Sequence, residues 1–62
     1  MDYTRAIINF SKAIARNPND AKLYESRAVC YFNAKDYVRS RRDAQKAKML
    51  GGEVDSILLE AR

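Results

Sequence analysis

Apolar side chains recur every three or four residues along the first part of the chain. They form a single stripe, which consists of Tyr3, Ala6, Ile7, Phe10, Ala13 and Ile14. This spacing is typical of an amphipathic helix that buries one face. Pro18 ends the pattern, because the residue before a proline is pushed out of helical geometry.

Three further helices are predicted after this proline. The second runs from Ala21 to Ala34, with Asn19 or Asp20 as its N-terminal cap. The third begins at Tyr37 after the capping residue Asp36, and it ends at Gly51-Gly52, where glycine can adopt a left-handed conformation without penalty. A short fourth helix carries the apolar residues Val54, Ile57, Leu58 and Ala61. The sequence therefore predicts an all-α fold.

The chain also repeats itself with a period of 34 residues. Asp2-Tyr3-Thr4-Arg5 aligns with Asp36-Tyr37-Val38-Arg39, and Lys12-Ala13 aligns with Lys46-Ala47. Self-similarity at such a period is typical of solenoid proteins, in which each repeat is one helical hairpin.

These residues resemble the tetratricopeptide repeat family. The second helix of a unit in that family carries Asp-Tyr, alanine, an aromatic, alanine and proline at fixed steps, matched here by Asp2-Tyr3, Ala6, Phe10, Ala13 and Pro18. The following helix is similar to the first helix of a unit in Tyr24, Ala28 and Tyr31, and Leu23–Ala28 resembles co-chaperone members. The third helix departs from the pattern, since Ser40, Ala44 and Gly52 stand where Ala6, Phe10 and Pro18 stand one period earlier.

The resemblance implies antiparallel helical hairpins of a right-handed superhelix. We expect residues 1–19 to be the second helix of a truncated unit, residues 20–52 one complete unit, and residues 53–62 a terminal helix. The first helix of the first unit is missing from this sequence. Either a longer array or a second copy would cover the exposed apolar face, so we predict self-association through Tyr3, Ile7, Phe10 and Ile14.

The family's binding surface is a concave groove lined by the first helix of each unit. The resemblance points six residues of the second helix toward this groove: Lys22, Glu25, Ser26, Val29, Phe32 and Asn33. Phe32 is the strongest candidate anchor, although it could instead pack on a neighbouring helix. Some members grip the acidic C-terminus of a chaperone with a lysine, asparagine and arginine clamp. Here Ser26, Ser56 and Glu60 occupy the matching places, which argues against such a clamp.

The net charge of +4 is concentrated in one basic run of the third helix. Arg39, Arg41, Arg42 and Lys46 could contact nucleic acid or an acidic protein surface. The alternative is a solvated helix face that Asp43 interrupts. No aromatic residues interleave the run, so we expect this alternative and do not expect nucleic acid as a partner.

No catalytic or cofactor-binding pattern is present in the sequence. Histidine is absent, which removes the usual base at neutral pH, and Gly51-Gly52 lacks the features of a phosphate-binding loop. Cys30 cannot form an internal disulfide and is expected to pack against other side chains. We therefore expect no enzyme activity, no metal or cofactor, no small-molecule substrate and no membrane segment. The sequence predicts a protein-binding scaffold of the cytoplasm, a role also compatible with the nucleus.

Overall fold

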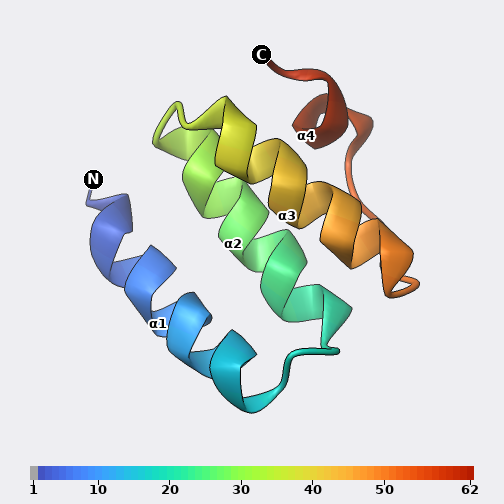
Figure 1. Cartoon of the computed structure of the whole chain (residues 1–62). Coiled ribbons are helices and arrows are strands. Elements are labelled where there is room, and N and C mark those ends of the chain that lie inside the picture. Colours follow the sequence, from blue (N-terminus) through green and yellow to red (C-terminus); the bar gives the residue numbers. More distant parts are fainter. Residues whose placement is uncertain (1) are drawn as a thin grey trace.

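The computed structural model describes residues 2–62, which fold into helices without strands. Its elements are α1 (Tyr3–Arg16), α2 (Ala21–Asn33), α3 (Tyr37–Met49) and α4 (Ser56–Glu60). The three long helices lie side by side with α2 in the middle, and α4 packs on α3 and touches α2 (Figure 1). Neighbouring long helices run antiparallel, as short connections require (Figure 1). The all-α prediction and the order of the helices are confirmed.

Every helix begins after an aspartate that acts as its cap. One carboxylate oxygen of Asp2, Asp20, Asp36 and Asp55 accepts the backbone N–H two or three residues later, at 2.9–3.2 Å. Such a cap satisfies a donor that the helix itself leaves unpaired, and it stabilises the helix by about 1 kcal/mol. Of the two candidates before α2, Asp20 is the cap and Asn19 is not.

The helix ends differ slightly from the prediction. α2 ends at Asn33, and Ala34 is its C-terminal cap. α3 ends at Met49, and Gly51 then takes the left-handed conformation with a φ of 87°. The Gly52 N–H donates to the Ala47 carbonyl at 2.9 Å, which closes the last turn. The fourth helix is shorter than the apolar pattern suggests, since Val54 and Ala61 lie outside it.

Small side chains bring α2 and α3 close together. Ala28, Ser40 and Ala44 are completely inaccessible to solvent. The Ser40 hydroxyl donates to the Ala28 carbonyl at 2.8 Å, so this buried polar side chain is paired. The serine that replaces alanine in the repeat pattern is therefore accommodated by a hydrogen bond across the hairpin.

The apolar core consists of two adjoining clusters. In one, Ile14, Tyr24 and Ala47 join α1, α2 and α3; in the other, Ala28, Ala44 and Leu58 join α2, α3 and α4. Val54 packs against both clusters, so the segment before α4 connects them. Ile14, which we expect on the self-association face, is 9% exposed because it packs with Tyr24 of α2 and Ala47 of α3.

Candidate protein-interaction surface

The solvent side of α2 carries four residues at helical spacing. Lys22, Ser26, Val29 and Asn33 follow one another at steps of four, three and four residues, so they share one face. Lys22, Val29 and Asn33 are exposed and Ser26 is half-buried, whereas Tyr24 and Ala28 on the opposite side are buried. We call these four residues the α2 stripe. Three of its four residues are exposed to solvent.

The two other groove candidates on α2 lie beside the stripe. Phe32 is half-buried, packs against the cluster of Ala28, Ala44 and Leu58, and meets Tyr37 edge to face with ring centres 5.3 Å apart. This arrangement favours the packing alternative for Phe32. Glu25, seven residues before Phe32 and thus two turns earlier on the same side of α2, is also half-buried. Val29, which is 43% exposed, is the large apolar side chain that the stripe presents to solvent.

A polar network links the three long helices on another side of α2. The Arg27 guanidinium donates to both carboxylate oxygens of Asp43, at 2.7 and 2.8 Å, and to the Ser11 hydroxyl at 3.0 Å. Ser11 in turn donates to the Ile7 carbonyl at 2.7 Å. Two parallel hydrogen bonds between an arginine and a carboxylate fix both distance and angle, so this contact sets the position of α2 relative to α3.

Two tyrosines of α2 enclose the Arg27 guanidinium. Its central carbon lies 5.8 Å from the ring centres of both Tyr24 and Tyr31, close enough for cation–π attraction. The hydrogen bond to Asp43 raises the pKa of Arg27, although burial opposes this shift. The cation is therefore permanent. The Tyr24 hydroxyl donates to the Pro18 carbonyl at 2.8 Å, which fastens the connection between α1 and α2.

The apolar face of α1 is covered less completely than its counterpart on α3. Ala6, Phe10 and Ala13 are half-buried. One period later, Ser40, Ala44 and Ala47 of α3 are fully buried against their neighbours. Among residues 2–62, α1 packs on α2, and the two remaining members of the predicted self-association face, Tyr3 and Ile7, are half-buried.

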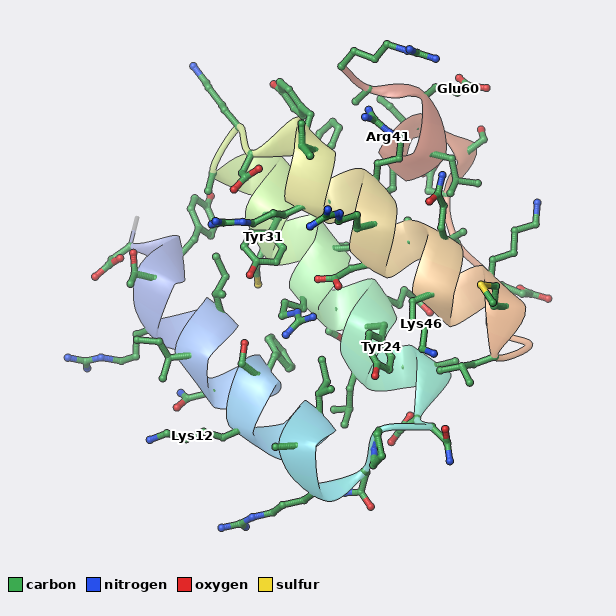
Figure 2. The ribbon with its side chains drawn as sticks, in the orientation of Figure 1. Lys12, Tyr24, Tyr31, Arg41, Lys46 and Glu60 are labelled. Carbon is green, nitrogen blue, oxygen red and sulfur yellow. The ribbon has the colours of Figure 1, made fainter. Side chains whose placement is uncertain are left out.

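The basic run of α3 is divided by the fold. Arg39, Arg42 and Lys46 are exposed. Arg41 instead extends toward α4, where its guanidinium donates to the Ala61 carbonyl at 2.9 Å (Figure 2). We expected Asp43 to interrupt the basic surface, but the structure places it away from that surface. The whole residue is 6% exposed, because its carboxylate is bound by Arg27 of α2.

Three further features bear on function: the Cys30 thiol, metal-binding side chains and membrane-spanning helices. Cys30 is half-buried, and burial raises the pKa of its thiol. Residues 2–62 contain no cluster of side chains suited to hold a metal ion. No helix within the same range has the length and apolar character needed to cross a bilayer.

The tetratricopeptide repeat model matches residues 9–42, from the middle of α1 into α3. This chain belongs to the tetratricopeptide repeat family. The match includes all of α2, which carries the stripe, and the resemblance inferred from the sequence is confirmed.

Curated relatives of this repeat chain are Hsp70-Hsp90 organizing proteins of plants. Hsp70-Hsp90 organizing protein 3 of Arabidopsis thaliana is 41% identical over 44 residues, which are 71% of this chain and 8% of the relative. The Hsp70-Hsp90 organizing protein of Triticum aestivum and Hsp70-Hsp90 organizing protein 1 of Glycine max match over the same shares of both chains. The chain thus spans less than a tenth of these relatives. No solved structure matches it significantly.

The network of Arg27, Asp43 and Ser11 was not expected from the sequence. One signal was available, because Asp43 lies three residues after Ser40 and thus on the α3 face that meets α2. An aspartate there needs a partner, and Arg27 follows Tyr24 by three residues on α2. The pairing itself could only be seen once the two helices were placed against each other.

Proposed function

We propose that this chain is part of a protein-interaction scaffold that binds a segment of its partner along the α2 stripe. The observation that carries this proposal is that Lys22, Val29 and Asn33 share one face of α2 and are exposed, with the half-buried Ser26 between them. Membership of the tetratricopeptide repeat family supports it, as do relatives whose names describe the organization of Hsp70 and Hsp90.

The chemistry of the stripe defines the kind of segment that fits it. Lys22 offers a positive charge at one end, Val29 an apolar contact in the middle, and Ser26 and Asn33 hydrogen-bonding groups. The stripe is about 16 Å long, since each helical residue rises about 1.5 Å. A short peptide with a carboxylate near Lys22 and an apolar side chain at Val29 would complement it.

A chaperone C-terminus held by a full carboxylate clamp is not part of this proposal. Ser26 and Ser56 carry no positive charge, and the exposed Glu60 would repel a carboxylate. Affinity would come from the apolar contact at Val29 and from the preformed helix surface.

The proposal can be tested with an isotope-labelled chain titrated with overlapping short peptides that tile Hsp70 and Hsp90. We expect some peptides to shift the amide resonances of the α2 stripe. Val29→Asp should weaken this binding, because it places a charge at the apolar contact. Ile8→Asp is the matched control, since Ile8 is 48% exposed on α1, and it should bind normally. If no peptide perturbs the stripe, or if both variants behave alike, the proposed site is wrong.

A second function, self-association through α1, is supported by the different coverage of α1 and α3. The half-buried Ala6, Phe10 and Ala13 correspond to positions that are fully buried on α3. A helix from a second copy could cover them as α2 covers α3. The apolar area gained would stabilise the pair, at about 25 cal/mol per Å² buried.

A further inference from the structure

Three cations are aligned on the solvent face of α3. Arg39, Arg42 and Lys46 are spaced by three and four residues, so they lie on one side of the helix and all three are exposed. Arg39 has a carboxylate nearby, since its guanidinium lies 3.5 Å from Asp36, but this pair is largely open to water. Such exposed pairs contribute little and exchange readily with other anions.

The negative charge that the sequence places among these cations is absent from the surface. Asp43 is the sole acidic residue of α3, and both of its carboxylate oxygens are bound by Arg27 in the interior. Its charge is thus offset by Arg27, whose side chain is only 19% exposed. The outer face of α3 consequently presents positive charge without an acidic neighbour on the same helix.

Two exposed apolar side chains accompany the cations. Val38 is 58% exposed and Met49 is 80% exposed. They lie four residues before and seven residues after Arg42, which places them on its side of the helix. The face therefore begins and ends with an apolar group, about 16 Å apart along the helix axis, with the cations between them.

We propose that this face of α3 binds an acidic amphipathic segment of a partner protein, with carboxylates on Arg39, Arg42 and Lys46 and apolar side chains on Val38 and Met49. Charge complementarity selects an anionic partner. The two apolar groups favour a polypeptide over nucleic acid, because phosphates would gain nothing from them. Within the described chain, the outer side of α3 also lacks an aromatic platform on which bases could stack, since Tyr37 packs on Phe32.

This surface is separate from the α2 stripe, so the two proposals can fail independently. The probe is a labelled peptide of the whole proposed pattern, with glutamates at helical spacing between two terminal leucines. A second peptide replaces both leucines by serine, and a single-stranded oligonucleotide of equal charge serves as the third probe. Binding of each to the full chain is measured by fluorescence anisotropy at low and at physiological salt.

Two triple variants separate this face from the overall charge. Arg39→Gln/Arg42→Gln/Lys46→Gln should weaken binding of the leucine peptide about tenfold, as expected for three exposed ion pairs. Arg5→Gln/Lys12→Gln/Arg16→Gln removes the same charge from exposed positions of α1 and should change binding less than about twofold. Circular dichroism checks that both variants stay helical. In Val38→Ser/Met49→Ser, the preference for the leucine peptide over the serine peptide should disappear.

Two results would overturn the proposal. Equal losses in the two triple variants would show that net charge alone attracts the peptide. Equal binding of the oligonucleotide and both peptides to the unaltered chain would show a general polyanion surface instead of a site for an amphipathic segment.

Discussion

Arg27 of α2 holds Asp43 of α3 by two hydrogen bonds, of 2.7 and 2.8 Å, while its third nitrogen reaches Ser11 of α1. A single side chain thus links the three long helices. The exposed fractions of the two paired side chains are 19% and 9%, so the pair is shielded from most of the solvent. Such an ion pair positions the helices. Removing one partner destabilises the fold, because it leaves a shielded charge without its counterion.

Asp43→Asn should destabilise the chain, because it leaves the partly buried Arg27 cation without its anion. We expect a loss of about 2 kcal/mol in the free energy of unfolding, less than for a fully buried pair because some water reaches Arg27. Urea denaturation followed by circular dichroism measures this loss. The control is Arg39→Gln, which removes an exposed pair and should cost less than about 0.5 kcal/mol. Similar losses in the two variants would show that the network does not hold the helices together.

The two glycines after α3 should respond differently to the same substitution. A Cβ at Gly52 would lie 2.8 Å from the Ala21 Cβ and 3.0 Å from the Ala47 carbonyl oxygen, whereas a Cβ at Gly51 would meet nothing within 4 Å. Gly51 needs only a residue that tolerates its positive φ, and asparagine does so. Gly52→Asn should therefore cost about 2 kcal/mol of stability and Gly51→Asn less than about 1 kcal/mol. Thermal unfolding of the two variants compares them, and the reverse order would contradict this account.

If α1 mediates self-association, the solution mass should depend on Phe10. Light scattering over a hundredfold range of concentration should show a rise above the monomer mass of 7.1 kDa. Phe10→Asp should remain monomeric, because a buried carboxylate at the contact would be costly. Val29→Asp places the same charge on α2 and should associate as the unaltered chain does. A mass of 7.1 kDa at every concentration would dismiss self-association.

Cys30 should react slowly in the folded chain, because burial raises the pKa of its thiol. The thiolate is the reactive form, so at mildly alkaline pH alkylation should be slower in the native chain than in urea. The folded state favours the protonated thiol. Protonated Cys30 therefore stabilises the folded chain relative to the thiolate. This stabilisation is fully present below the ordinary pKa of the thiol and is lost as the pH rises through the raised pKa. The native and denatured rates should therefore converge at higher pH, whereas equal rates at mildly alkaline pH would show that Cys30 is freely accessible.

Local features of the sequence were enough to predict the helices. The apolar spacing from Tyr3 to Ile14 defined α1, and Asp36 and Gly51 marked the limits of α3 because caps and left-handed turns depend on neighbouring residues alone. The repeat period of 34 residues was also visible in the sequence, and it led to the family. These signals are short-range, so they do not require knowledge of how the helices pack.

The status of individual side chains was decided by contacts between helices. Phe32 looked like a groove anchor, yet it packs on Tyr37 and the cluster around Leu58. Ile14 looked open to a partner, yet the same chain covers it.

Asp43 shows most clearly that contacts between helices decide whether a side chain is exposed. It looked like a surface charge, yet it pairs with Arg27, which lies 16 positions earlier. The sequence by itself determined the four helices, the cap of α3 and the family, because periodicity and capping act within a few residues. The tertiary structure alone decided which faces stay free for partners, because burial and ion pairing depend on residues that are distant in the chain and adjacent only after folding.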